Sequence, residues 1–182
     1  MALQIIFSVL VLLGLSTAQQ LASTDYQVKA AYLFNFAKFV EWPANTFSSP
    51  GSRLEICVLG SSPFGRGLED SIAGKTVGGR RLLISHRSDP VQARSCQIVF
   101  IAISDKEQIR QTLQQLSGAS VLTVGDTSGF IEDGGMINFV LDGDRVRFEA
   151  NVNAAELVHL KLSARLLTVA KAVIGKSQDE KH

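Results

Sequence analysis

Residues 25–43 read DYQVKAAYLFNFAKFVEWP, and this stretch organises the rest of the chain. Its apolar side chains recur at helical spacing and fill an arc well beyond half of the helix circumference. Thr24 and Gln27 have the spacing of a capping box, so we expect the helix to be capped by Thr24. Pro43 cannot continue a helix, and we expect the last helical residue near Glu41.

The apolar arc of this predicted helix is wider than one core requires. A helix on the surface of a monomer needs a stripe only a little wider than about 100°. One interpretation is a helix buried between its own sheet and a neighbouring helix, and the other is a helix shared with a second subunit or a partner. Aromatic side chains tend to dominate interface energies. We therefore single out Phe34, Phe39 and Trp42 as candidate residues of a partner or dimer interface.

The start of the chain has the pattern of an export signal. The apolar run Ile5–Leu15 is too short to cross a membrane core, which needs about 20 residues. Small residues follow the run, and we place signal-peptidase cleavage near Ala18, so that residues 1–18 are the signal peptide. The segment before the run carries no Lys or Arg, which is atypical of such signals. We expect an exported, soluble protein in which residues 19–182 form a single α/β domain.

The charge of the chain excludes one class of partner. Its formal net charge is +1, which gives no global attraction to nucleic acid or to an anionic membrane. The densest basic segment, between Arg80 and Arg94, is predicted to be an ordinary solvated face. We therefore expect no nucleic-acid partner.

About 160 mature residues are enough to bury roughly 70% of the unfolded surface in one core.

The two cysteines are Cys57 and Cys96. In an oxidising compartment, two cysteines of one domain usually form a disulfide. Both belong to apolar runs, and adjacent parallel strands would bring them within bonding distance. The alternative is a pair of buried thiols that pack as small hydrophobic side chains. No CxxC or HxxxH spacing accompanies them, so no metal site is predicted.

The rest of the chain alternates strands and helices, which predicts an α/β, Rossmann-like fold. Such a fold has a mostly parallel sheet with helices on both faces. The turn Asp142-Gly143-Asp144 predicts an antiparallel C-terminal hairpin at one edge. The predicted strands are Leu54–Gly60, Arg80–Ser85, Gln97–Ala102, Val121–Val124, Met136–Leu141 and Arg145–Glu149. The predicted helices after the first are Pro63–Ala73, a helix capped by Ser104 that ends near Leu116, and Ala154–Ile174.

The last predicted helix places two polar side chains on its apolar side. Asn153 is its expected cap, and His159 and Ser163 stand four residues apart, close enough to meet. We expect a buried, hydrogen-bonded pair. A catalytic role would need a carboxylate and an exposed nucleophile, and the sequence places neither.

Two loops are candidates for ligand binding, because ligands of α/β sheets gather beyond the carboxyl ends of the strands. The first loop, Gly60–Gly65, lacks the Lys and Ser/Thr of a P-loop and the spacing of a dinucleotide fingerprint. In the second loop, Gly125–Gly129, Asp126 is expected to cap the turn that follows. No catalytic motif is recognisable, so we predict no catalytic residue, no metal and no cofactor. The candidate loop residues are Gly60, Ser61, Ser62, Phe64, Gly125, Asp126 and Thr127.

Several motifs together carry a resemblance to a known family. They are the export signal, VKAAYLFNFAKFVEWP (28–43), a strand with Cys57, GGMINFV (134–140) with RVRFEANVNAAE (145–156), and LKLSARLL (160–167). This combination resembles the YfiR family of periplasmic proteins over essentially the whole mature chain. The resemblance also implies a disulfide between Cys57 and Cys96.

The resemblance implies a function in regulation. The best-known YfiR-like proteins bind and repress the periplasmic sensor domain of an inner-membrane diguanylate cyclase, and so act on cyclic-di-GMP signalling and biofilm formation. An OmpA-like outer-membrane lipoprotein can sequester the regulator, and members occur as homodimers. We thus expect a non-enzymatic periplasmic regulator, with a periplasmic small-ligand binding module that feeds a membrane sensor as the alternative. An exported hydrolase ranks third.

Overall fold

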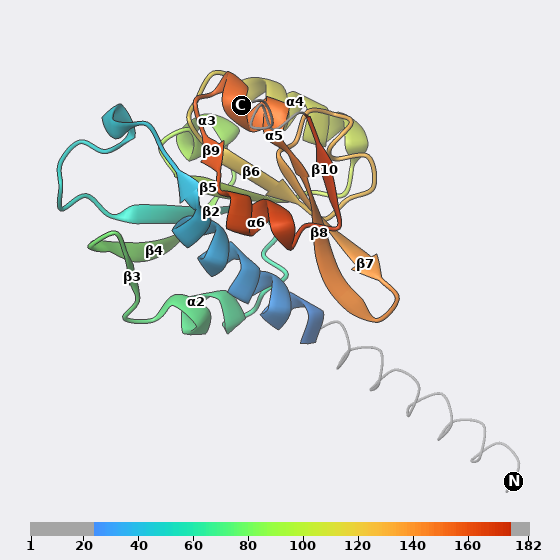
Figure 1. The fold of residues 1–182 in the computed structure, drawn as a ribbon, viewed down its shortest axis with the longest axis horizontal. Coiled ribbons are helices and arrows are strands. Elements are labelled where there is room, and N and C mark those ends of the chain that lie inside the picture. Colours follow the sequence, from blue (N-terminus) through green and yellow to red (C-terminus); the bar gives the residue numbers. More distant parts are fainter. Residues whose placement is uncertain (1–23, 176–182) are drawn as a thin grey trace, which may run out of the picture.

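The computed structural model describes residues 24–175, and in this part of the chain one large sheet carries the fold (Figure 1). Its strands follow the order β10-β8-β7-β6-β5-β2-β4-β3. They are β2 (Leu54–Gly60), β3 (Thr76–Val77), β4 (Arg80–Arg87), β5 (Ile98–Ala102), β6 (Leu122–Gly125), β7 (Ile137–Asp142), β8 (Arg145–Asn151) and β10 (Ala172–Ile174). A separate pair is formed by β1 (Val40–Glu41) and β9 (Lys161–Leu162). The helices are residues 24–39, the 3-10 turn η1 (Ala44–Thr46), α2 (Gly67–Ile72), α3 (Pro90–Ala93), α4 (Lys106–Leu116), α5 (Val152–Leu157) and α6 (Ala164–Thr168).

The predicted fold class is confirmed. Strands β4, β2, β5, β6 and β7 are parallel neighbours, and β7 and β8 form the predicted antiparallel hairpin. Strand β10 adds to β8 in parallel and lies outside the hairpin, at the edge of the sheet. No helix within residues 24–175 is long and apolar enough to cross a membrane.

Each face of the sheet has its own core. The helix over residues 24–39 crosses one face between α2 and α6 (Figure 1), and it buries Leu33 and Phe36 completely. Helices α3 and α4 cover the other face, where Cys57 and Phe130 belong to a second buried cluster. The runs that form the central strands are apolar without alternation because both faces of a parallel sheet are covered.

The ends of the first helix differ from the prediction. Thr24 is itself helical, so it is not the cap. At the other end, Val40 and Glu41 leave the helix and form β1. The reason is a backbone partner far along the chain, because the Ser163 amide donates to the Phe39 carbonyl at 3.0 Å where β9 pairs with β1.

The single helix predicted over Ala154–Ile174 is wrong. The chain there forms α5, β9, α6 and β10 in turn. His159 has a left-handed backbone with φ +62°, which ends the first short helix. The cap of α5 is Asn151 rather than Asn153, since the Asn151 Oδ1 accepts the Ala154 amide at 3.0 Å.

The buried pair predicted for His159 and Ser163 is also wrong. His159 is exposed. The Ser163 hydroxyl instead caps α6, where it accepts the Leu166 amide at 3.3 Å. A residue that starts a helix has no place inside a longer one, because its backbone is extended.

Two other helix starts lie later than predicted. Helix α2 begins at Gly67 rather than Pro63, and the intervening Phe64 is buried in the core. Helix α4 is capped by Asp105 rather than Ser104, because the Asp105 Oδ1 accepts the Gln108 amide at 2.8 Å.

Candidate functional site

The first turns of the N-terminal helix are joined to the loop that follows β6. The hydroxyl of Tyr26 donates to the Asp126 Oδ2 at 3.0 Å, and the Lys29 Nζ donates to the same oxygen at 2.7 Å. The Lys29 Nζ also lies 4.1 Å from the centroid of the Tyr26 ring. The side chains of Lys29 and Asp126 are only 13% and 18% exposed, so this is a largely buried ion pair.

Tyr26 keeps its proton in this setting. Burial, reinforced by the nearby Asp126 carboxylate, raises the pKa of Tyr26 from 10.0 to about 12. Its hydroxyl is therefore a donor throughout the physiological range. We predicted that Asp126 caps the following turn. In the structure its carboxylate instead accepts hydrogen bonds from Tyr26 and Lys29 of the N-terminal helix.

Both predicted ligand loops contact Tyr26. Phe64, from the loop after β2, packs edge-on against Tyr26 with ring centroids 5.4 Å apart. Phe64 also packs edge-on against Phe100 of β5, with ring centroids 4.8 Å apart. Tyr26 thus contacts both the loop after β2 and the loop after β6.

The other residues of these loops have mainly structural surroundings. Gly60 has φ +99°, and a Cβ there would lie 2.6 Å from the Ala102 carbonyl oxygen. The Thr127 hydroxyl donates to the Ile103 carbonyl at 3.3 Å. Ser61 is exposed, and Gly125 is buried. Among the described residues, the Ser62 hydroxyl is buried without a hydrogen-bond partner.

The three aromatic residues predicted for an interface are all half-buried. Phe34, Phe39 and Trp42 pack against the core on the helix side of the sheet. The Trp42 Nε1 donates to the Gln97 carbonyl at 3.1 Å, which ties this ring to the chain just before β5. The first interpretation, in which the chain itself covers the helix, therefore accounts for much of the wide apolar arc.

Two lysine ammonium groups lie close to the two phenylalanine rings. The Lys38 Nζ lies 5.5 Å from the Phe34 centroid and 5.4 Å from the Phe39 centroid. The Lys75 Nζ approaches Phe34 more closely, at 4.4 Å. We call these four residues (Phe34, Phe39, Lys38 and Lys75) the lysine–phenylalanine face.

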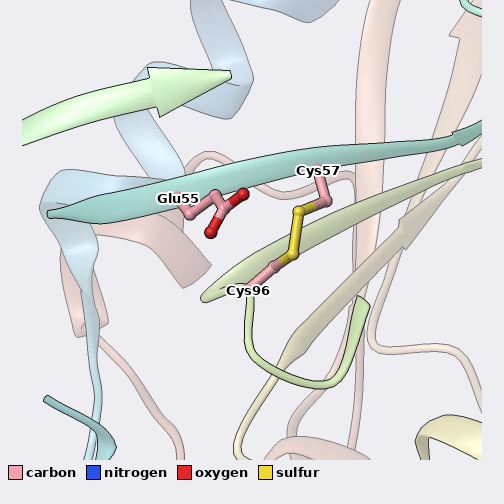
Figure 2. A group of neighbouring side chains, drawn as sticks. All are labelled: Glu55, Cys57 and Cys96. Atoms are coloured by element: carbon pink, nitrogen blue, oxygen red, sulfur yellow. A yellow bond between two sulfur atoms is a disulfide. The ribbon is translucent and has the colours of Figure 1, made fainter. Parts of the chain in front are cut away.

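Cys57 and Cys96 form the expected disulfide, with Cα atoms 6.1 Å apart (Figure 2). Glu55 projects from the same side of β2 as Cys57, and it receives hydrogen bonds from Ser85 and, at 2.9 Å, from Arg87. Glu55, Cys57 and Cys96 have the side-chain types of a metal site. Because the two sulfur atoms are bonded to each other, however, neither is available as a thiolate ligand.

Residues 26–171 match the family described as YfiR/HmsC-like. The chain belongs to the YfiR/HmsC-like family. The resemblance noted in the sequence is confirmed, and the family consists of periplasmic proteins that regulate rather than catalyse.

Two solved structures are similar to part of this YfiR/HmsC-like protein. A conserved domain protein from Vibrio cholerae O1 biovar eltor has 14% identity and a TM-score of 0.47, over 67% of this chain and 54% of that one. An ABC domain from Streptococcus pneumonia, in complex with L-Trp, has 12% identity and a TM-score of 0.48, over 66% and 55% of the two chains. This chain therefore spans about half the length of either protein.

Three exposed apolar side chains of this YfiR/HmsC-like protein were not among the predicted site residues. Leu157 at the end of α5 is 82% exposed, and Val173 and Ile174 of the edge strand β10 are 42% and 40% exposed. Leu157 and Ile174 line a groove of about 340 Å³ between α4, α5 and β10. The sequence signal for the edge strand β10 was the short run AVI (172–174), which contains two β-branched residues. This run fell within the helix predicted over Ala154–Ile174.

Proposed function

We propose that this protein binds the periplasmic sensor domain of an inner-membrane diguanylate cyclase and holds the cyclase inactive. Membership of a family of periplasmic regulators is the observation that carries this proposal. A regulator of this kind acts by binding another protein, and so it needs a surface with accessible apolar groups.

The proposed interface is the part of the N-terminal helix around Phe34, Phe39 and Trp42. Each of these rings packs against the core and is still partly accessible. A partly buried ring is pre-organised, so it loses little conformational freedom when a partner covers the remainder. This supports the helix as a rigid docking surface.

Repression then follows from differential affinity. A regulator that binds the inactive conformation of the sensor domain more tightly than the active one shifts the population toward the inactive state. A shift from 1:99 to 99:1 requires about 10⁴-fold tighter binding to the favoured state. In this proposal an OmpA-like outer-membrane lipoprotein competes for the regulator and releases the cyclase, and the regulator itself is a homodimer.

The test uses the mature protein and the purified periplasmic domain of a membrane-anchored diguanylate cyclase encoded in the same genome. Calorimetry measures their dissociation constant, and cyclase activity is measured in membranes with and without the regulator. Phe34→Ala is expected to weaken binding and to restore cyclase activity. Val91→Ala is the matched control, because Val91 is 60% exposed on α3 at the other face of the sheet. No binding by the wild-type protein would overturn the proposal.

The alternative function is a small-ligand binding module that uses the loops at Gly60–Phe64 and Gly125–Thr127. Its support is the position of these loops at the carboxyl ends of β2 and β6. A metabolite that raises the melting temperature of the wild-type protein would favour it. A ligand of these loops would have to displace or contact Tyr26, so Tyr26→Ala should change that stabilisation.

A further inference from the structure

We propose that the lysine–phenylalanine face binds a carboxylate-bearing, partly apolar segment of the partner protein. This inference rests on the proposed function, because it names the chemistry of the surface that the partner presents to the N-terminal helix.

The first argument is the geometry of the two lysines. Both ammonium groups lie over the same ring, with Lys75 at 4.4 Å and Lys38 at 5.5 Å from the Phe34 centroid. Both lysine side chains are exposed. Two positive charges gathered at one ring attract a nearby carboxylate more strongly than either charge would alone.

The second argument is that these charges are not compensated. Elsewhere, Lys29 pairs with Asp126 at 2.7 Å and Lys171 with Asp142 at 3.1 Å. Within residues 24–175, Lys38 and Lys75 have no carboxylate within ion-pairing distance, and their close neighbours are the phenylalanine rings. A cation held over an aromatic ring but open to solvent is ready to receive an anion.

The third argument concerns the apolar part of the occupant. Phe34 and Phe39 are half-buried, so a side chain of the partner can complete their burial while its neighbouring carboxylates reach the lysines. Such a surface has an apolar centre with a charged rim, which is the usual anatomy of a protein interface. An anionic bilayer is a poorer match, because rings seated in the core do not protrude to insert among lipid chains.

The first experiment measures binding of the mature protein to the periplasmic domain of the cyclase. The Lys38→Glu/Lys75→Glu variant is expected to bind about tenfold more weakly at low salt, with the loss mostly in the association rate and reduced at high salt. Lys38→Arg/Lys75→Arg should retain binding. The single variants Lys38→Glu and Lys75→Glu are compared with Lys106→Glu, which makes the same change of charge at an exposed lysine of α4 on the other face. All variants are checked by melting temperature, since these exposed side chains are not part of the core.

The second experiment does not depend on the cyclase. Amide chemical shifts of the mature protein are followed during titration with a short peptide that repeats Glu-Leu-Gly, and with its Lys-Leu-Gly counterpart. The acidic peptide is expected to shift amides around Phe34 and Lys38, and the basic peptide is not. Equal effects of both peptides, or shifts that persist in the Lys38→Glu/Lys75→Glu variant, overturn the inference. Stronger shifts with phosphatidylglycerol vesicles than with the acidic peptide also overturn it, in favour of a membrane.

The two experiments separate the two proposals. If the cyclase domain binds wild type and the Lys38→Glu/Lys75→Glu variant equally, the inference fails and the proposed function stands. If the acidic peptide binds at the face while the cyclase domain does not bind at all, the proposed function fails and the chemistry assigned to the face stands.

Discussion

Lys29 and Asp126 form an ion pair of 2.7 Å although they stand 97 positions apart in the chain. The contact fastens the start of the N-terminal helix to the loop after β6. Since both side chains are largely buried, the pair costs desolvation, and its contribution depends on both members being present.

Removal of one member of this pair should destabilise the fold. Lys29→Met leaves the Asp126 carboxylate buried without its cation, and we expect a loss of about 3 kcal/mol in the free energy of unfolding. Denaturant titration measures this. The double variant Lys29→Met/Asp126→Leu should lose less than the two single variants add up to, because no lone charge remains. Strict additivity would show that the two residues act independently.

Tyr26 should contribute a distinct dependence on alkaline pH. Its pKa is about 12 in the folded protein and close to 10.0 in the unfolded chain. The contribution of Tyr26 to stability is therefore complete below pH 10 and is lost as the pH rises through about 12. Thermal melts of wild type and Tyr26→Phe across this window should show a shallower alkaline decline for the variant. Parallel declines would contradict the assignment.

The disulfide should stabilise the domain through the chain it closes. Cys57 and Cys96 are separated by 39 positions, and a loop of this size corresponds to about 4 kcal/mol in the chain-entropy model. Cys57→Ala/Cys96→Ala is expected to lower the free energy of unfolding by about that amount. A thiol reductant should then lower the melting temperature of wild type but not that of the variant.

Gly60 is a position where only glycine fits. A Cβ would lie 2.6 Å from the Ala102 carbonyl oxygen, and the backbone φ is +99°. Gly60→Ala is expected to cost about 1–3 kcal/mol, since strained backbone conformations carry penalties of this order. Gly51→Ala is the matched control, because a Cβ at Gly51 would have no neighbouring atom within 4 Å and its φ is not left-handed. Equal denaturation midpoints for the two variants would refute this.

The parallel centre of the sheet could be predicted because its signals are local. The run LEICVLG (54–60) is apolar and β-branched and ends in glycine, and IVFIA (98–102) has the same apolar, β-branched character. The hairpin of β7 and β8 could likewise be predicted from its turn at Asp142–Asp144. In each case the residues that form the element also carry the pattern that identifies it.

The C-terminal region shows where periodicity fails. Its apolar spacing fits a helix, but β9 and β10 exist because β1 and β8 offer them backbone partners. The Lys171 amide, for example, donates to the Phe148 carbonyl at 2.7 Å. The spacing of apolar residues within a segment does not indicate whether a distant strand will offer that segment backbone hydrogen bonds.

Some features of the candidate site could be predicted from the sequence, and others only from the structure. Sequence alone was sufficient to find the aromatic helix, the cysteine pair and the two loops at strand ends, because residue type and local spacing define all three. Only the tertiary structure decided that Tyr26 and Lys29 meet Asp126, and that Lys38 and Lys75 share the Phe34 ring. The physical reason is that strand order and helix placement bring these groups together across long separations, and those are set by the packing of the whole core.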